Sequence, residues 1–466
     1  MYTDTIAGIA TALSNSGISI IRVSGDDSIK IVNRIFSSSK FSDLADAESN
    51  YLNYGFIVDS EGKIVDEVLV SLMRHPKSYT REDVVEINCH GGVLVTKKIL
   101  EMLVKNGARI AEPGEFTKRA FLNGRLDLSQ AEAVMDVINS NNEYSLKTGV
   151  RQLKGDLRDK IAEIRAELIE RIAEIESSLD DPEHFSLEGL QNRLSGIINA
   201  QIHVLNSLIA SYGNGKIIKN GINTVIVGKP NAGKSSFLNS ILGIERAIVT
   251  DVAGTTRDVL EENVSVNGIS LNIKDTAGIR NTDDVVEKIG VEIAFDSIKD
   301  SDLILYVVDS SVALDENDDR IIESILNKKI IVLFNKTDLK SAFSEDELVE
   351  KMICLGINRD NIDLIKISAK ENKGIDDFRC KVEELFSLGE IEENNELIIT
   401  SLRQKEALED AVNSLYLVID TMNAGMPEDM MTIDMMSAYT SLGRVIGEAV
   451  DDDLVNEIFS KFCMGK

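Results

Sequence analysis

The feature that most constrains this chain is a glycine-rich segment directly after an apolar run. The run INTVIV is followed by GKPNAGKS at 228–235, which matches G-x-x-x-x-G-K-[ST]. In this pattern backbone N–H groups curl around a phosphate, the lysine neutralises the β- and γ-phosphate oxygens, and the serine hydroxyl ligates Mg²⁺. The sequence therefore predicts a strand, a phosphate-binding loop and a helix. The residues expected at the nucleotide are Asn231, Ala232, Gly233, Lys234, Ser235 and Ser236.

Three further segments, in order along the chain, indicate that the nucleotide is GTP. In DTAG (275–278), Asp275 is expected beside Mg²⁺ and the Gly278 N–H beside the γ-phosphate. In NKTD (335–338), the Asp338 carboxylate can accept both N–H donors of the guanine edge, a donor pair that adenine lacks. The segment SAK (368–370) can offer a backbone N–H to the guanine oxygen. The expected GTP-binding residues here are Asp275, Thr276, Ala277, Gly278, Asn335, Lys336, Asp338, Ser368 and Ala369.

A polar loop, TDVAGTTRD (250–258), lies between the first two of these motifs. We expect Thr256 to complete the Mg²⁺ shell with Ser235, and an ordinary surface loop is the alternative. The other loop residues expected at GTP are Thr250, Asp251, Val252, Ala253, Gly254 and Thr255.

Hydrolysis needs a group that the DTAG motif does not supply. Ile279 follows Gly278, and an aliphatic side chain cannot orient the attacking water as glutamine does. The candidates are Glu287 and a monovalent cation held by the Asn231 amide oxygen. From spacing alone, a solvated helix face is the favoured interpretation of Glu287.

The chain has 466 residues, a length typical of about three domains. Its pattern of apolar and polar residues changes from one region to the next. Short β-rich runs and helical stretches predict an α+β domain at the start. An apolar stripe from Leu153 to Leu179 then favours a packed helical bundle over a long coiled coil. Apolar runs alternating with amphipathic stretches predict an inserted α/β domain with a mostly parallel sheet, after which helices return. The expected class is multidomain α/β, with boundaries at 1–120, 121–215, 216–385 and 386–466.

Composition excludes several classes of protein. The 78 acidic and 50 basic residues give a net charge of −28, so a basic surface over the whole chain, as in many nucleic-acid binders, is excluded. The four cysteines lack the paired spacing of a zinc site or a disulfide framework. No apolar run reaches the roughly 18 residues of a membrane span. We therefore expect a soluble, cytoplasmic protein with no membrane partner.

Motifs distributed over nearly the whole chain resemble the MnmE (TrmE) family of tRNA uridine-modifying GTPases. They are DTIAGIAT, IRVSG, CHGG, EPGEFTKRAFLNGRLDL, KPNAGKSS, DVAGTTRD and the terminal CMGK. The resemblance implies an N-terminal domain that binds folate and dimerises, a helical domain split in sequence, and an inserted Ras-like G domain. It also implies that two G domains meet across the nucleotide and that K⁺ stimulates hydrolysis. The family's K⁺ positions match Asn231, Thr250, Val252 and Thr255, and its catalytic glutamate matches Glu287.

The same resemblance implies a site for 5,10-methylene- or 5-formyltetrahydrofolate at Arg22, Glu86, Arg125 and Lys466. Arg125 stands where a relative has a lysine. The planar guanidinium of arginine and the compact ammonium of lysine make contacts of different geometry. From the residues alone, Arg22 and Glu86 are equally well explained as charges at strand ends. Cys463 matches the cysteine of the family's C-x-G-K motif, which is linked to tRNA modification. Without the family, an isolated terminal cysteine is more often inert.

The expected function is that of a homodimeric GTPase in a heterotetramer or larger complex with the FAD-dependent MnmG protein. By resemblance, the complex installs a (carboxymethyl)aminomethyl group at carbon 5 of the wobble uridine of certain tRNAs. Two alternatives remain open. A GTP-gated ribosome-assembly factor predicts an appended RNA-binding module such as a KH domain, and no basic C-terminal domain with a GXXG loop is evident. The other alternative is a scaffold whose helical domain oligomerises.

Overall fold

The computed structural model divides into two compact units, each discontinuous in sequence. The first comprises Met1–Ile138, Val150–Leu205 and Glu406–Lys466, and the second comprises Asn139–Gly149 and Asn206–Lys405. Both contain helices and strands, so the predicted multidomain α/β class is confirmed. The structure describes residues 4–180, 190–242, 261–274, 298–299, 301–326, 328–386, 397–448, 450, 452–462 and 465.

The first unit contains a seven-stranded sheet in the order β3-β4-β5-β6-β2-β1-β7. Its strands are β1 (Ile6–Ile9), β2 (Ser16–Ser24), β3 (Phe36–Ser37), β4 (Leu52–Val58), β5 (Ile64–Met73), β6 (Val84–Gly91) and β7 (Arg109–Ile110). Neighbours are antiparallel except β1 and β7, which are parallel. The 3₁₀ turn η1 (Leu44–Asp46) lies between β3 and β4.

Side chains alternate between the two faces of this sheet. Ile21 and Val23 of β2 belong to the buried core that includes residues of α1 (Ser28–Asn33) and α2 (Val93–Lys105). Arg22, between them in β2, therefore points to the opposite face. This alternation buries one face in the hydrophobic core and places Arg22 and Glu86 on the other, where Tyr54 and Leu69 are exposed.

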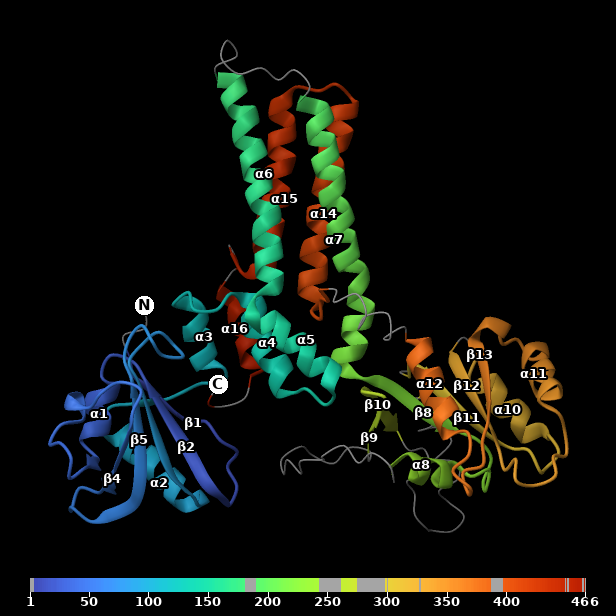
Figure 1. Ribbon diagram of the computed structural model, residues 1–466, viewed down its shortest axis with the longest axis horizontal. Helices are drawn as coiled ribbons and strands as arrows, with labels where there is room; N and C mark the ends of the chain where they lie inside the picture. Colours follow the sequence, from blue (N-terminus) through green and yellow to red (C-terminus); the bar gives the residue numbers. More distant parts are fainter. Residues whose placement is uncertain are drawn as a thin grey trace. The chain divides into compact units, whose positions relative to one another are not determined.

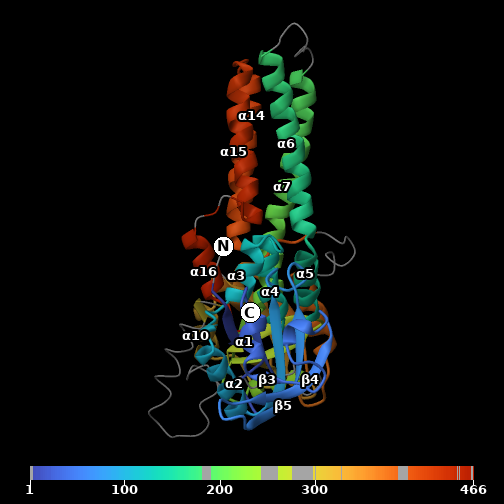
Figure 2. The same cartoon turned by 90° about the vertical axis from the view of Figure 1, so that its left-hand side faces the viewer.

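The helices α3 (Glu115–Leu122), α4 (Leu128–Ile138), α6 (Asp156–Asp180), α15 (Glu428–Ile446) and α16 (Asp452–Ser460) belong wholly to the first unit. The helices α5 (Glu143–Lys154), α7 (Leu190–Asn220) and α14 (Leu402–Asn423) each continue into the second unit. Within the first unit, the portions of α7 and α14 run alongside α6 and α15 (Figure 1, Figure 2). The predicted bundle packing is thus found, because the apolar stripe of α6 is buried from Leu157 to Ile175.

The predicted stripe was wrong at both ends. Leu153 lies in α5, and Gly155 with φ +99° separates α5 from α6. A residue in the left-handed conformation interrupts the helix. The apolar spacing nevertheless continues past this break, which is why the sequence suggested one uninterrupted helix. Leu179 is exposed near the end of α6.

The second unit contains a six-stranded sheet in the order β13-β12-β11-β8-β10-β9. Its strands are β8 (Ile222–Val227), β9 (Glu261–Val266), β10 (Ile269–Lys274), β11 (Leu303–Asp309), β12 (Lys329–Asn335) and β13 (Ile362–Lys366). All neighbours are parallel except the β9–β10 hairpin. Asn267 and Gly268 form its two-residue turn, both with positive φ, and an Asn-Gly pair is favoured in such turns because both central residues need this conformation.

Both faces of the central strand β11 are buried, as is typical of parallel sheets covered by helices. Leu305 and Val307 contribute to one core, and Tyr306 and Val308 to another. Among the described residues, the helices that lie wholly in this unit are α8 (Lys234–Leu242), α10 (Glu316–Ser324), α11 (Glu345–Cys354) and α12 (Ile375–Leu385), with the 3₁₀ turn η2 (Arg359–Asn361) before β13. The predicted mostly parallel sheet is confirmed.

Across the described residues, no helix combines the length and apolar character needed to cross a lipid bilayer.

Candidate functional site: a phosphate loop, a base pocket and an arginine–tyrosine cluster

The phosphate loop joins the end of β8 to the start of α8. Gly228 has φ +151° and Gly233 has φ +103°. A Cβ atom at Gly228 would collide with the Val307 carbonyl oxygen, and one at Gly233 would collide with the Asn335 amide. Both positions therefore require glycine. The loop leads into the N-terminus of α8, where free backbone N–H groups favour an anion.

Lys234 is already anchored inside this loop. Its Nζ donates to the Gly228 carbonyl oxygen at 2.7 Å and to the Lys229 carbonyl oxygen at 2.9 Å. Ser235 and Ser236 follow in the first turn of α8 and are exposed. Asn231 is also exposed and has φ +62°. The structure thus brings an ammonium group and an exposed hydroxyl to the same helix end.

Asn335, at the end of β12, connects the phosphate loop to the segment after β13. Its Nδ2 donates to the Ala232 carbonyl oxygen at 2.8 Å. Its Oδ1 accepts from the Ala369 N–H at 3.1 Å. Because the Asn335 side chain is buried, both bonds are shielded from water. A single amide therefore holds the two loops that were predicted to bind phosphate and base.

Asp338 and Ser368, from the two segments predicted to recognise guanine, lie together. Ser368 Oγ donates to Asp338 Oδ1 at 2.7 Å. This hydrogen bond lowers the pKa of the Asp338 carboxyl, and Lys370 and Lys373 add to the effect. An ionised carboxylate at the end of a parallel strand can accept the two guanine donors. Lys336, next to Asn335, forms an ion pair with Asp309.

Part of the predicted nucleotide site and two predicted terminal residues lie outside the described residues. They are Thr250, Asp251, Val252, Ala253, Gly254, Thr255, Thr256, Asp275, Thr276, Ala277, Gly278, Glu287, Cys463 and Lys466. Their roles remain predictions.

Arg22 and Arg125, far apart in sequence, meet at one aromatic ring, and Glu86 pairs with Arg22. Arg22 and Glu86 are register partners on β2 and β6, and Arg22 Nε donates to Glu86 Oε1 at 2.8 Å. The Arg22 guanidinium carbon lies 5.2 Å from the centroid of the Tyr79 ring, and that of Arg125 lies 4.7 Å from it. Arg125 Nη1 also donates to the Tyr79 carbonyl oxygen at 2.8 Å. Arg22 Nη1 donates to the Gly465 carbonyl oxygen at 3.5 Å.

The loop that carries Tyr79 is fixed to α3 and to the residue that ends it. Tyr79 Oη shares a hydrogen bond with Thr117 Oγ1 at 2.9 Å. Asn123 Nδ2 donates to the Thr80 carbonyl oxygen at 2.7 Å. These contacts orient the tyrosine ring between the two arginines.

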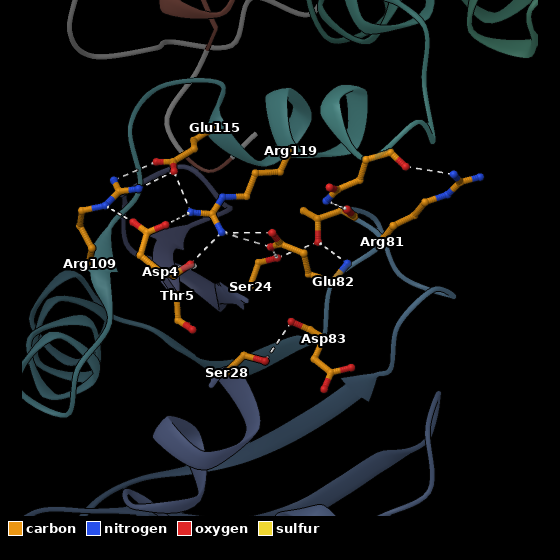
Figure 3. Close-up of polar contacts among 12 residues, drawn as sticks. Asp4, Thr5, Ser24, Ser28, Arg81, Glu82, Asp83, Arg109, Glu115 and Arg119 are labelled. Atoms are coloured by element: carbon orange, nitrogen blue, oxygen red, sulfur yellow. Dashed lines mark hydrogen bonds and ion pairs between the residues drawn. The ribbon is translucent and has the colours of Figure 1, made fainter. Parts of the chain in front are cut away.

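A buried charge cluster holds the end of the same loop (Figure 3). The side chain of Arg119 in α3 is 0% exposed. Its guanidinium forms ion pairs with Asp4 at 2.8 Å, Glu115 at 3.0 Å and Glu82 at 3.2 Å. A buried guanidinium needs such partners, because an uncompensated charge in the interior is costly. Arg119 therefore ties α3 to the start of the chain and to the loop before β6.

Glu115 is the most buried carboxylate of this cluster. Burial alone would raise its pKa, but hydrogen bonds from Arg109, the Glu112 N–H and Arg119 lower it below the ordinary value. The pKa of Asp4 is likewise lowered: burial opposes the shift, and Arg109 and Arg119 outweigh it. Both carboxyls are therefore ionised at neutral pH.

Sequence reasoning did not assign Tyr79, Arg119 or Asp309. Arg119 stood within the motif EPGEFTKRAFLNGRLDL, yet nothing in that string distinguishes a buried arginine from an exposed one. Asp309 had a usable signal: it ends an apolar run, and ligands bind at the carboxyl ends of parallel strands. Tyr79 had none, because its partners come from three separate segments.

The P-loop pattern on a strand–loop–helix unit, with Asn335, Asp338 and Ser368 brought together on the same mostly parallel sheet, defines the chain as a GTP-binding P-loop protein of the GTPase class.

Comparison with known proteins identifies the family. Residues 128–463 match the family model of the MnmE helical domain, and residues 5–125 match that of the GTP-binding protein TrmE N-terminus. The chain therefore belongs to the MnmE (TrmE) family.

Relatives of the same name match the chain over its whole length. The tRNA modification GTPase MnmE of Lachnoclostridium phytofermentans is 53% identical, covering 100% of each chain. That of Acetivibrio thermocellus is 47% identical, covering 99% of each. A solved structure of a variant of Aquifex aeolicus Era bound to GDP.AlF4- is 26% identical over 42% of this chain and 66% of that chain, with a TM-score of 0.27. A TM-score this low supports no conclusion about the present chain.

Proposed function

We propose that this chain is a K⁺-stimulated GTPase that acts in tRNA modification. With an FAD-dependent partner, it takes part in installing a (carboxymethyl)aminomethyl group at carbon 5 of the wobble uridine. The observation that carries the proposal is full-length identity of 53% to a protein named tRNA modification GTPase MnmE. The loop geometry around Asn335 supports the GTP-binding part.

In the proposed nucleotide site, the Lys234 ammonium neutralises phosphate, and Ser235 and Thr256 ligate Mg²⁺. Asp338 and the Ala369 N–H recognise guanine. Asn231, Thr250, Val252 and Thr255 hold K⁺, and Glu287 acts on the attacking water. Asn231 is exposed and lies in the loop before α8, in the left-handed conformation. Its side-chain amide oxygen is therefore open to a cation, which supports the proposed role.

In the proposed folate site, Arg22, Glu86 and Arg125 bind a tetrahydrofolate derivative beside Tyr79. The residues suit such a ligand chemically, because it carries carboxylates, N–H donors and aromatic surface. The exposed Arg125 fork can pair with a carboxylate, and Glu86 can accept from ring N–H groups. Gly465, the sequence neighbour of Lys466, already accepts from Arg22, which supports a role for the terminal motif and Cys463 here.

We further propose that the chain is a cytoplasmic homodimer that contacts its partner through the N-terminal sheet. Leu52 and Tyr54 of β4 and Leu69 of β5 are exposed, and Tyr54 and Leu69 are register partners on one face. Sedimentation velocity tests this: Tyr54→Asp should produce monomers. Tyr416→Asp, which alters an exposed tyrosine of α14, is the matched control. If both variants remain dimeric, the dimer interface does not include this face of the N-terminal sheet.

The function itself is tested by nucleoside mass spectrometry of bulk tRNA from cells lacking the gene, complemented with the intact chain or with Cys463→Ser. We expect the wobble-uridine modification to vanish without the gene and to return only with the intact chain. If the modification persists without the gene, the tRNA proposal is overturned and only the GTPase assignment remains. The rate of GTP hydrolysis, measured in K⁺ and in Na⁺ at equal ionic strength, separately tests K⁺ stimulation. Equal rates in the two salts would overturn that part of the proposal.

A further inference from the structure

Asp309 ends β11 directly beside the end of β12. The two strands are parallel, and Asp309 is in register with Asn335. The Ser310 N–H donates to the Asn335 carbonyl oxygen at 3.0 Å, which continues the pairing past the strand end. Asp309 thus lies directly opposite the first residue of the segment that was predicted to recognise guanine, on the neighbouring strand.

The Asp309 carboxylate binds the ammonium group of Lys336. Lys336 Nζ donates to Asp309 Oδ2 at 2.6 Å. The Asp309 side chain is 10% exposed and that of Lys336 is 32% exposed, so the pair is only partly screened by water. Lys336 has φ +63°, a conformation that a lysine adopts only when its surroundings enforce it.

The carboxylate is itself oriented by the following turn. Asp309 Oδ1 accepts from the Ser311 N–H at 3.0 Å and from Ser311 Oγ at 2.6 Å. Each carboxylate oxygen therefore has a separate task, one toward the turn and one toward Lys336. Burial alone would raise the pKa of Asp309, but Lys336 and Ser311 lower it below its ordinary value. The carboxyl is ionised at neutral pH.

We propose that Asp309 is a positioning residue for guanine recognition, acting through Lys336. By holding the ammonium group, it fixes the aliphatic stem of Lys336 as a shelf against which the base can pack. A long flexible side chain otherwise loses rotamer freedom when the base binds, and ordering it beforehand removes that cost. The proposal rests on the GTPase class of the chain and is independent of the tRNA proposal.

The location of Asp309 predicts which kinetic quantity changes. Asp309 acts on the base side, whereas Lys234 and Ser235 lie at the phosphate loop. Loss of the carboxylate should therefore accelerate nucleotide release and raise KM for GTP by more than it changes kcat. A purely structural role would lower the thermal midpoint without this kinetic pattern.

The experiment measures release of N-methylanthraniloyl-GDP from the full chain by stopped-flow fluorescence. Asp309→Asn should release the nucleotide about tenfold faster, the factor that corresponds to an ordinary coupling between contacting residues. The matched control is Asp363→Asn in β13. Asp363 pairs with Lys381 at 2.8 Å, both side chains being 24% exposed, so this variant removes a similar ion pair from the same sheet. Unchanged release in Asp309→Asn, or equal acceleration in both variants, would overturn the proposal.

A double-mutant cycle with Lys336→Met tests whether Asp309 acts through Lys336. The double variant should release nucleotide no faster than Lys336→Met alone. Additive effects would mean that Asp309 acts by another route. Asp309→Glu restores a carboxylate and should recover part of the slow release, whereas no recovery together with a wild-type thermal midpoint would also contradict the proposal.

Discussion

The nucleotide site and the arginine–tyrosine cluster use polar groups in opposite ways. In the nucleotide site, a buried neutral amide, Asn335, joins two loops, and the largely buried carboxylate of Asp309 is paired with a single ammonium group, that of Lys336. In the first unit, a fully buried charge, Arg119, is compensated by three carboxylates. A neutral bridge tolerates loop movement around a ligand, whereas a buried charge cluster is costly to break. We infer that the first unit supports its site rigidly, while the nucleotide site depends on loop placement.

The largest expected effect comes from removing the buried charge. Arg119→Met should lower the free energy of unfolding of the first unit by about 3–5 kcal/mol, because three carboxylates lose their shared partner. Hydrogen-exchange mass spectrometry of peptides covering α3 and the loop before β6 measures this locally. The control, Lys30→Met, removes an exposed pair with Asp27 and should change little. Protection in Arg119→Met equal to that of the control would mean that the cluster does not support the site.

Removing the neutral bridge should affect ligand binding more than the fold. Asn335→Ala deletes two buried hydrogen bonds, and we expect GDP affinity to fall about a hundredfold. Isothermal titration calorimetry measures the affinity. Asn335→Asp keeps an acceptor for the Ala369 N–H but buries a carboxylate against the Ala232 carbonyl oxygen, so its affinity should be no higher than that of Asn335→Ala. Equal affinities for all three would show that loop placement does not depend on this amide.

A smaller effect is expected at the aromatic ring of the proposed folate site. Tyr79→Leu removes the surface between Arg22 and Arg125, and 5-formyltetrahydrofolate should bind about tenfold more weakly. Tyr79→Phe keeps the ring and loses only the hydrogen bond with Thr117, so its affinity should stay closer to wild type. Equilibrium dialysis with the full chain measures both. If Phe weakens binding as much as Leu, the hydroxyl and not the ring is the important group.

The smallest effect concerns pH. Glu115 has an ordinary pKa of 4.5 that folding lowers, so its stabilising contribution is complete above 4.5 and is lost as pH falls through the lower folded value. Asp4 faces the same arginines, Arg109 and Arg119, and contributes in the same direction. Urea unfolding at pH 5 and below should therefore depend less on pH in Glu115→Gln than in wild type. Identical slopes would assign the acid sensitivity to other groups.

Much of the fold follows from local patterns in the sequence. The apolar runs at β8, β11, β12 and β13 predicted a mostly parallel sheet, and these strands pair in parallel. The break at Gly155 was missed, because apolar spacing does not report backbone φ.

The two sites differ in how much of each the sequence determined. The phosphate loop is contiguous, so its glycines and Lys234 were recognisable from spacing, and the family resemblance indicated Arg22, Glu86 and Arg125. Only the tertiary structure decided that Arg22 and Arg125 contact Tyr79 while Glu86 pairs with Arg22, that Arg119 is buried among carboxylates, and that Asp309 holds Lys336. The physical reason is that these contacts depend on strand register and on helix placement between segments far apart in the chain, which no local periodicity encodes.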